Sequence, residues 1–268
     1  MKICNKIFKD KTYIMGILNI TPDSFSDGGK YNCLDKALFK CEKMILDGAD
    51  VIDIGGESTR PGHIKISSQE EIERVLPILI KIKNNFDIPI SIDTYKSEVA
   101  EEVLKNGADL INDIWGLKWD EKIASVIKKY NASCCIMHNR EDLNYNDFLI
   151  DVKHDLKKSI NIAKENLIND DKIIIDPGVG FAKTYEQNMK IVNNLSFFND
   201  LNYPILLGTS RKSLIGISLD LAVDERLEGT LATTVFAVLN KCLFVRVHDI
   251  MENKSIIIMT EKIIKEGK

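Results

Sequence analysis

Carboxylate and amide side chains recur in this chain directly after short apolar segments. Asp176 ends the apolar run of KIIIDPGVGF and stands before Pro177 and Gly178. Three consecutive isoleucines predict a strand buried on both faces, and a carboxylate at its end is costly to desolvate unless something binds it. Asp176 could instead cap the next helix, but the helical pattern begins only near Thr184. We therefore interpret Asp176 as a binding group.

The same arrangement recurs along the chain. The polar residues that follow apolar segments are Asn19, Asp53, Asp93, Asn112, His138, Asp176, Ser210, Arg211, Lys212, Arg246 and His248. A cap or a turn could explain any one of them, but hardly all of them together. Asp93, Asn112 and Asp176 offer acceptors and an amide, which suit a planar heterocycle with several N–H groups. Positive charge for a diphosphate or another anion could come from Arg60, Arg211, Lys212, Arg246 and His248.

Some of these residues have a plainer interpretation. Arg211 taken alone is more typical of a surface, and His138 is more simply explained by loop packing. Asp53 and Glu57 could hold loop geometry or basic partners rather than substrate. Trp115 could stack on a ring or contact a helix, and both alternatives stay open. The segment HNREDLNYN after the fifth predicted strand receives no role.

The elements that must position these residues alternate between short apolar and longer amphipathic segments. Strands are predicted at residues 13–19, 50–54, 88–93, 109–112, 133–137, 172–176, 204–208 and 243–246. Helices are predicted at residues 32–47, from Ser67 or Ser68 onward, and at 97–106, 121–130, 147–166, 185–195, 222–239 and 251–266. Ser68 with Glu71 fits a capping box.

Eight such units in 268 residues average roughly 33 residues each, a normal length for a βα repeat. We predict a single domain over residues 1–268, folded as a (β/α)8 TIM barrel. Closure leaves no sheet edge, and the active site of such a barrel lies at the C-terminal ends of the strands.

Composition narrows the class of protein. The chain is 44% hydrophobic and 28% charged, as expected of a globular enzyme, and its formal net charge of −4 predicts no nucleic-acid partner. We expect no membrane span and no signal peptide, because the apolar runs are short and MKICNKIFKD lacks an apolar core. The six cysteines form no CxxC pair, which indicates a reducing cytoplasm, and the histidines lack the spacing of a zinc site.

Seven segments, taken in order, resemble the motif series of the dihydropteroate synthase family. They are GILNITPDSFSDGG, DIGGESTRPG, SIDTYK, INDIWG, IIDPGVGFAK, LLGTSRKSLIG and RVHDI, and they extend over essentially the whole chain. The resemblance implies a transferase of folate biosynthesis that joins para-aminobenzoate to 6-hydroxymethyl-7,8-dihydropterin diphosphate. The products would be 7,8-dihydropteroate and diphosphate. It also implies a requirement for Mg²⁺, a cytoplasmic homodimer and sensitivity to sulfonamides.

The resemblance assigns roles to residues at the matching positions. The pterin would be contacted by Asp93, Asn112, Asp176 and Lys212, of which Asp93, Asp176 and Lys212 would be catalytic. Asn19 would help to hold Mg²⁺. The diphosphate would be bound by Thr59, Arg246, Val247 and His248. The aminobenzoate would be framed by Phe25, Thr59, Pro61, Phe181 and Ser213, together with Lys212. The segments ITPDSFSDGG and GGESTRPG would close over the diphosphate and the aminobenzoate.

The chemistry of these groups favours one path. An aniline-type nitrogen is a weak nucleophile, so departure of the diphosphate must carry most of the barrier. We expect an SN1-like path without a covalent enzyme intermediate, because neither Tyr31 nor Ser26 has a base that the sequence places beside it. Two alternatives remain. One is a methyltetrahydrofolate methyltransferase serving a corrinoid protein, which needs no diphosphate cluster. The other is a pterin-binding paralogue without catalytic activity.

Overall fold

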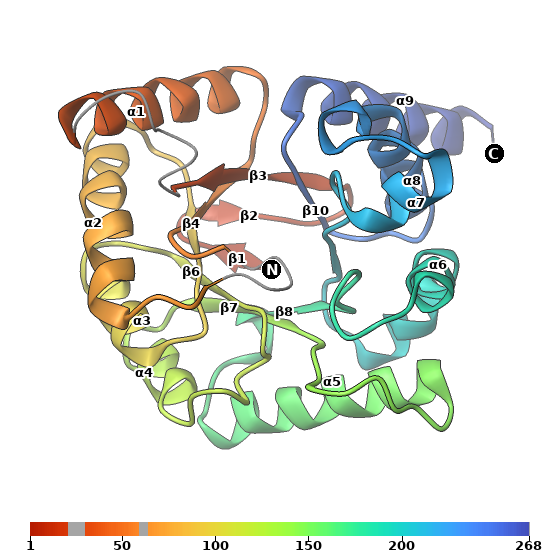
Figure 1. Cartoon of the computed structure of the whole chain (residues 1–268), viewed down its shortest axis with the longest axis horizontal. Coiled ribbons are helices and arrows are strands. Elements are labelled where there is room, and N and C mark those ends of the chain that lie inside the picture. The colour runs from red at the N-terminus through yellow and green to blue at the C-terminus, as the bar shows by residue number, and fades with distance from the viewer. Residues whose placement is uncertain (21–29, 59–63, 268) are drawn as a thin grey trace.

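Eight parallel strands form a ring at the centre of the molecule (Figure 1). The computed structural model describes residues 1–20, 30–58 and 64–267. In sheet order the strands are β8 (Ile173–Asp176), β7 (Ser133–Met137), β6 (Leu110–Asp113), β5 (Ile90–Asp93), β4 (Val51–Gly55), β3 (Tyr13–Asn19), β10 (Phe244–Val247) and β9 (Leu206–Leu207). A bridge between Ile175 and Ile205 joins β8 to the segment entering β9 and closes the ring. The predicted barrel is confirmed.

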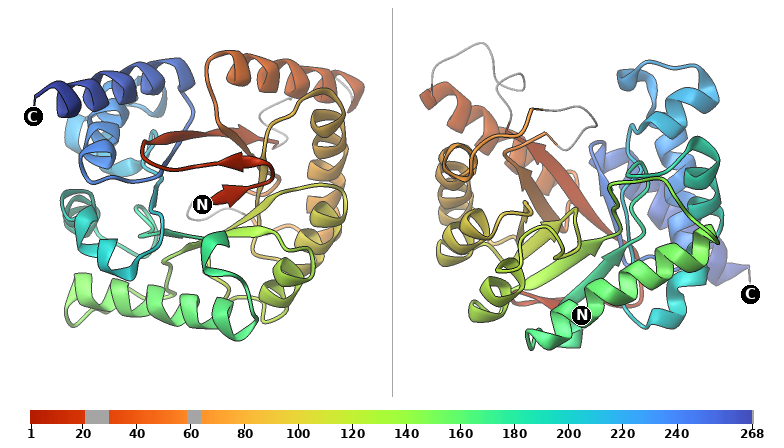
Figure 2. Two further views of the ribbon diagram at one scale, coloured as in Figure 1. Left: turned by 180° about the vertical axis from the view of Figure 1, so that it is seen from behind. Right: turned by 60° about the horizontal axis from the view of Figure 1, so that its bottom comes forward.

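Helices surround this ring on its outside (Figures 1 and 2). They are α1 (Lys30–Leu46), α2 (Ser68–Asn85), α3 (Ser97–Lys105), α4 (Ile123–Lys129), α5 (Phe148–Glu165), α6 (Tyr185–Asn193), α7 (Ser213–Leu219), α8 (Leu227–Leu239) and α9 (Ile250–Glu266). Short 3-10 turns occur at Asp170–Lys172, Leu195–Leu201 and Val223–Glu225. Among the described residues, no helix has both the length and the hydropathy that crossing a membrane requires.

Alternation along each strand divides the side chains between two cores. In β8, Ile173 and Ile175 pack outward with the helices, whereas Ile174 belongs to a separate cluster inside the barrel. The strand residues of that inner cluster are Met15, Val51, Leu110, Cys135, Ile174, Leu206 and Phe244, together with Tyr13. Two residues further along the same strands come the polar residues Asp53, Asn112, Asp176 and Arg246. The barrel is therefore lined by hydrocarbon below and by polar groups toward the C-terminal ends of its strands.

A hairpin of β1 (Lys2–Ile3) and β2 (Lys6–Ile7) precedes the barrel, and the sequence did not predict it. Ile3 and Phe8 are buried in the inner cluster. The Phe8 ring centroid lies 4.8 Å from that of Tyr13 and 5.1 Å from that of Phe244, both at the N-terminal ends of their strands. The hairpin thus closes the bottom of the barrel. Its two-residue strands are too short to show a period.

The predicted capping box at Ser68 and Glu71 is wrong. Ser67 is the N-cap of α2, because its hydroxyl accepts a hydrogen bond from the Glu70 backbone N–H at 3.1 Å. Glu71 does not reach back to the cap, since its carboxylate pairs with Lys96 at 2.7 Å. Glu71 is thus engaged in a tertiary ion pair instead of the predicted capping box.

The prediction of one helix over residues 222–239 is also wrong in its first part. Leu219 ends α7, which the sequence left unassigned, and α8 begins only at Leu227. Between them the Arg226 guanidinium donates to the carbonyls of Leu221, at 3.0 Å, and Arg211, at 3.0 Å. The intervening turn folds around this side chain, so the helical spacing does not continue through it.

Candidate active site

Arg246 of β10 binds two carboxylates at the polar level of the barrel. Its Nε donates to Asp53 Oδ2 and its Nη2 donates to Asp93 Oδ2, each at 2.6 Å. Asn112 Nδ2 lies 3.4 Å from the same Asp53 oxygen. Among the described residues, the second oxygens of both carboxylates, Asp53 Oδ1 and Asp93 Oδ1, have no hydrogen-bond partner. Buried oxygens seldom stay unpaired, so these two are suited to accept from a ligand.

Asp176 and Lys212 lie beside Arg246, around Gly208. A Cβ atom built on Gly208 would lie 3.7 Å from Asp176 Oδ2, 4.0 Å from Lys212 Nζ and 3.9 Å from Arg246 Cβ. The other oxygen of this carboxylate, Asp176 Oδ1, accepts from the Gly178 backbone N–H at 2.7 Å. Glycine at position 208 keeps the space between these groups open.

The structure thus brings together four residues that the sequence singled out: Asp93, Asn112, Asp176 and Lys212. Arg246 connects them, since it binds Asp93 directly and lies beside Gly208. The Oδ2 oxygen of Asp53 binds Arg246, which is the plainer of its two predicted roles, while its Oδ1 has no partner among the described residues. It also helps to hold the guanidinium in place between two strands.

Burial controls the electrostatics of this group. It raises the pKa of Asp93 to about 7, against the opposing charge of Arg246. It also raises the pKa of Asp176, with Lys212 as the main opposing charge. Burial lowers the pKa of Lys212 to about 8, and Asp176 acts in the opposite direction. Titratable groups of both signs with displaced pKa values at one end of a barrel are typical of a functional site.

An apolar cluster lies beside these polar groups, and the sequence analysis did not identify it. Tyr95, Ile114 and Met137 form its buried part, and Trp115 and Phe181 pack against it. The Lys212 Nζ atom lies 4.6 Å from the centroid of the Phe181 ring. Met137 stands two residues after the inward Cys135, so the strand period could have revealed that it faces inward.

The cationic residues differ in what they offer. Arg211 is paired with Asp249, at 2.5 Å from Nη2 and 3.1 Å from Nε, so its charge is already matched. His248 Nδ1 lies 2.9 Å from Ser210 Oγ. Burial, together with the nearby Arg246, lowers the pKa of His248 to about 4. The imidazole is therefore neutral near pH 7 and offers hydrogen bonding rather than the expected positive charge.

The remaining described candidates occupy the edges of the group. The Val247 side chain is buried in the outer core, so only its backbone could reach a ligand. Ser213 is exposed at the first residue of α7. The predicted residues Phe25, Thr59 and Pro61 lie outside the described residues, as do Ser26, Arg60 and His63.

Asn19 at the end of β3 is the candidate ligand for Mg²⁺. It is half-buried, and its Oδ1 lies 3.5 Å from the point where a Cβ on Gly55 would stand, with Asp93 Oδ2 at 4.0 Å from the same point. No group of three or more metal-binding side chains occurs within the described part of the chain. One oxygen ligand at an open rim fits Mg²⁺, which usually keeps several waters and shares substrate phosphates.

Comparison with known proteins gives consistent matches. Residues 15–248 match the family model described as pterin binding enzyme. The chain is 56% identical over 268 residues to the dihydropteroate synthase of Clostridium beijerinckii, covering 99% of this chain and 100% of that protein.

Solved structures agree with this match. A Clostridium difficile dihydropteroate synthase in the presence of pteroic acid superposes with a TM-score of 0.93 at 52% identity, covering 96% of this chain and 98% of that one. A Yersinia pestis enzyme with a sulfonamide drug gives 0.89 at 36% identity, with 95% of both chains covered. A Xanthomonas albilineans enzyme with 4-aminobenzoic acid gives 0.90 at 32% identity, covering 95% of this chain and 93% of that one.

Proposed function

Since the chain belongs to the dihydropteroate synthase family of pterin-binding enzymes, we propose that it condenses 6-hydroxymethyl-7,8-dihydropterin diphosphate with para-aminobenzoate. The products are 7,8-dihydropteroate and diphosphate. The observation that carries this proposal is the arrangement at the barrel mouth, where unpaired carboxylate oxygens lie beside Arg246 and Lys212. One end of such a site can accept ring N–H groups while the other attracts an anion.

The pterin ring binds deepest. Asp93 and Asp176 accept from its N–H groups, and Asn112 supplies an amide that can both donate and accept. These carboxylates also stabilise the positive charge that develops on the methylene carbon as its bond to oxygen breaks. Burial raises both pKa values and so disfavours the ionised form that this role needs. The neighbouring cations and the N–H groups of the ligand act in the opposite direction and favour that form.

The diphosphate departs toward the cations. Arg246 and Lys212 attract the growing negative charge, and neutral His248 can donate a hydrogen bond to a phosphate oxygen. Asn19 would hold Mg²⁺, which when bound neutralises phosphate charge. The bond to the leaving group breaks before the weak aniline nucleophile attacks, so the path is SN1-like. No covalent bond to the enzyme is formed.

The aminobenzoate meets the electron-poor carbon from the rim. Phe181 offers an aromatic face and Ser213 a hydroxyl, while the Lys212 ammonium lies over the Phe181 ring. A Xanthomonas albilineans family member has been solved with 4-aminobenzoic acid and a Yersinia pestis member with a sulfonamide drug. We extend both ligand classes to this chain.

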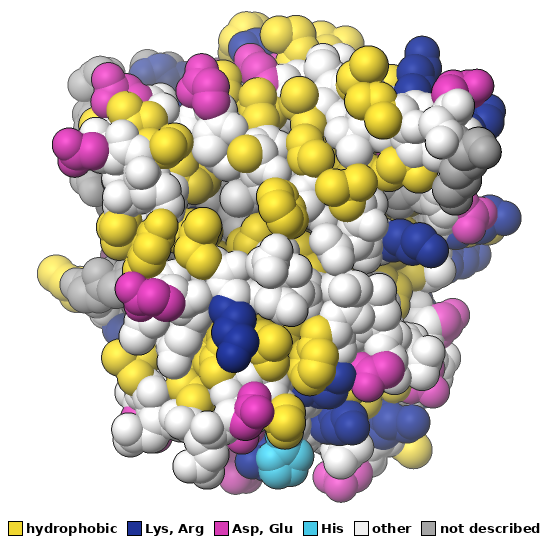
Figure 3. All heavy atoms as spheres, turned by 90° about the vertical axis from the view of Figure 1, so that its right-hand side faces the viewer, with side chains coloured by type: hydrophobic (Ala, Val, Ile, Leu, Met, Phe, Trp, Pro, Cys, Tyr) yellow, Lys and Arg dark blue, Asp and Glu magenta, His cyan; other side chains and the backbone are white. Residues whose placement is uncertain are grey.

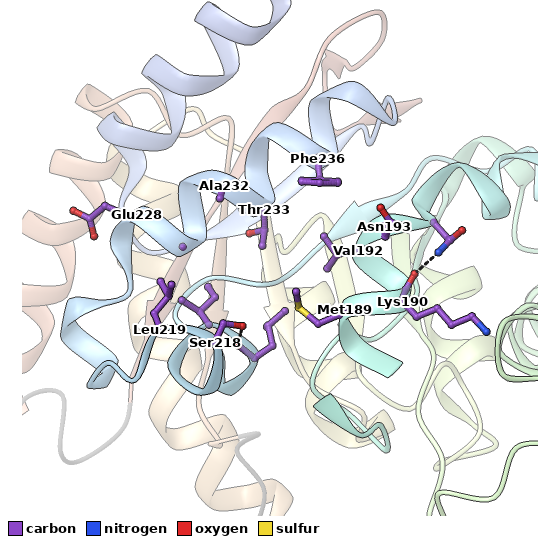
Figure 4. Close-up of a pocket in the computed structure, with 14 residues that line it drawn as sticks. Met189, Lys190, Val192, Asn193, Ser218, Leu219, Glu228, Ala232, Thr233 and Phe236 are labelled. Atoms are coloured by element: carbon purple, nitrogen blue, oxygen red, sulfur yellow. Dashed lines mark hydrogen bonds between the residues drawn. The ribbon is translucent and has the colours of Figure 1, made fainter. Parts of the chain in front are cut away.

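The protein also acts as a homodimer in the cytoplasm. The face formed by the later helices carries many hydrophobic side chains (Figure 3). An apolar groove of about 740 Å³ lies between α6, α7 and α8, and Met189, Val192 and Phe236 project into it (Figure 4). Phe236 is 41% exposed and Leu219 is 49% exposed. A second copy would cover this surface, which is typical of homodimer interfaces.

The described cysteines are free thiols, as in a reducing compartment.

A single assay tests the reaction. Purified protein is given the pterin diphosphate, para-aminobenzoate and Mg²⁺, and diphosphate release is followed. Release that requires para-aminobenzoate supports the synthase. Methyl transfer from methyltetrahydrofolate to a corrinoid would support the methyltransferase alternative, and pterin binding without diphosphate release would support the non-catalytic one. Light scattering of the same sample measures the mass, and a monomer would contradict the dimer.

A further inference from the structure

Lys183 lies under the loop that follows β8 and has no role in the reaction described above. Its Nζ donates to the carbonyls of Gly178 and Phe181, both at 2.9 Å, and lies 2.8 Å from His138 Nδ1. Burial lowers the pKa of Lys183 well below its usual value, but the three acceptors match the three N–H donors of an ammonium group and favour that form. Lys183 therefore ties both ends of the 178–181 turn to the end of β7.

The histidine in this contact is fixed in one form. Because Lys183 donates to Nδ1, the imidazole is neutral and carries its proton on Nε2. That nitrogen lies 3.3 Å from Asp155 Oδ2 but makes no hydrogen bond to any described residue, and Arg140 holds the same carboxylate oxygen at 2.5 Å. Burial lowers the pKa of His138 to about 4, which agrees with a neutral ring.

The rest of the turn is held almost as completely. The Gly180 N–H donates to Asn188 Oδ1 at 2.6 Å, and the Tyr145 hydroxyl donates to the carbonyl of Ala182 at 2.7 Å. The turn also lies hard against β7, because a Cβ on Gly178 would stand 2.0 Å from the His138 carbonyl oxygen.

One carbonyl of the turn and one ring face the site. The Val179 carbonyl accepts from Lys212 Nζ, and the Phe181 ring lies 4.6 Å from the same nitrogen. Both positions depend on the Gly178 and Phe181 carbonyls that Lys183 holds. A shift of the turn would therefore move Phe181 and Lys212 together.

We propose that Lys183, supported by His138, is a positioning residue that aligns Phe181 and Lys212 for the aminobenzoate. The proposal rests on the function assigned above, in which those two residues meet that substrate. Of the residues assigned to the pterin, Asp93 and Asn112 lie on β5 and β6, and the Asp176 backbone is fixed by β8, where its carbonyl accepts from the His138 N–H at 2.8 Å. Asp176 Oδ1 and Lys212 Nζ do bond the turn, at the Gly178 N–H and the Val179 carbonyl. The pterin end of the site should therefore be affected less than the aminobenzoate end, where Phe181 moves as well.

Steady-state kinetics with Lys183→Met tests this assignment. Misplacing a reacting group by about 1 Å can cost roughly 100-fold in rate, so we expect the KM for para-aminobenzoate to rise at least about tenfold. The KM for the pterin diphosphate should change less than about threefold. The affinity for pteroic acid should fall as the KM for para-aminobenzoate rises. A similar rise in both KM values would overturn the proposal, as would a lowered melting temperature with neither KM changed.

Lys118→Met is the matched control. Lys118 is also a lysine whose pKa is lowered by burial, but its Nζ donates to the Asn139 carbonyl at 3.0 Å and not to the turn. Its loss should lower the melting temperature while leaving the ratio of the two KM values within about twofold of the wild type. If Lys118→Met changed that ratio as much as Lys183→Met, the effect would be general destabilisation and the proposal would fail.

Three further variants keep the test decisive if Lys183→Met does not fold. His138→Asn retains an acceptor near the Nδ1 position and should keep the KM ratio near the wild-type value, whereas His138→Leu should raise it. Tyr145→Phe removes one bond to the turn and should raise the aminobenzoate KM about threefold. Equal ratios in all three variants would refute the role of the turn. Wild-type protein without any para-aminobenzoate-dependent diphosphate release would instead refute the proposed function.

Discussion

Two ion clusters, each of a basic side chain with two carboxylates, occur at the C-terminal end of the barrel, and they differ in how completely they are paired. In the floor cluster, Arg246 binds Asp53 and Asp93. In the rim cluster, Lys96 binds Glu57 at 2.6 Å and Glu71 at 2.7 Å. Among the described residues, each has one cation for two largely buried carboxylates.

The rim cluster is bonded mainly to its own surroundings. Glu57 accepts from the Tyr95 hydroxyl at 2.8 Å and from the Ile66 N–H at 3.2 Å, while Lys96 also donates to the Ile66 carbonyl at 2.8 Å. Only Glu71 Oε1 lacks a partner there among the described residues.

In the floor cluster two carboxylate oxygens, Asp53 Oδ1 and Asp93 Oδ1, lack a partner among the described residues. An ion cluster that satisfies itself acts as structural support, whereas one that keeps acceptors free is prepared for a ligand. Position in the barrel alone would not separate the two, because both lie near the strand ends.

Removing the cation from each cluster should show this difference most strongly. Arg246→Met leaves two buried carboxylates unpaired and should lower the free energy of unfolding by about 3–5 kcal/mol, with loss of detectable turnover. Lys96→Met should lower stability by a similar amount but retain pteroic acid binding. Urea unfolding and calorimetry measure both quantities. Equal loss of ligand affinity in the two variants would abolish the distinction.

Lys212→Ala should affect turnover far more than folding. Loss of a cation that meets developing charge should lower kcat by about 10²–10³-fold. The melting temperature should change little, because Lys212 is half-buried and its Nζ bonds one described carbonyl, that of Val179. Turnover per folded molecule and thermal unfolding are compared in one preparation. A fall in melting temperature in proportion to the lost activity would make Lys212 structural.

Asp176→Asn should weaken pterin binding by about 1–3 kcal/mol, since an amide replaces a charged acceptor. Asp113→Asn is the control. Asp113 is also a buried carboxylate at a strand end, but it accepts from the backbone N–H groups of Trp115 and Leu117, each at 2.7 Å. This change should lower stability and spare pterin affinity. Calorimetry with pteroic acid measures the affinity of both variants, and an unchanged affinity in Asp176→Asn would contradict the assigned role.

The pH profile should show the smallest effect. The ammonium form of Lys212 is lost as pH rises through about 8, and the carboxylate of Asp93 is lost as pH falls through about 7. The value of kcat/KM should therefore decline on both sides of a narrow optimum between these pH values. Lys212→Arg should move the alkaline limb upward, because arginine keeps its proton. An alkaline limb that stays in place would assign it to another group.

The sequence predicted the barrel and the residues at its strand ends, because burial and strand period are local signals. Ile173 to Asp176 shows this well, with outward and inward isoleucines followed by an inward carboxylate. The partner of Asp53 was not predictable, because Arg246 lies 193 residues away along the chain. Ser67 was not distinguishable from Ser68 as the cap for a related reason, since Lys96 binds Glu71.

The role that we propose for Lys183 was missed for the same physical cause. A lysine after a glycine-rich turn reads as solvated, and only the folded chain brings the Gly178 and Phe181 carbonyls within reach of its Nζ. Contacts of this kind depend on the three-dimensional position of backbone carbonyls, about which residue types carry no information.

The hairpin of β1 and β2 leaves the barrel open at one end only. Since Ile3 and Phe8 close the lower end, substrates must enter and products must leave at the C-terminal end of the strands, where Arg246 and Lys212 lie. The molecule that rests deepest has to arrive before the one that rests nearer the entrance, which predicts compulsory-order kinetics with the pterin diphosphate as the leading substrate. Aminobenzoate that binds first would block the entry of the pterin diphosphate, so excess para-aminobenzoate should slow the reaction.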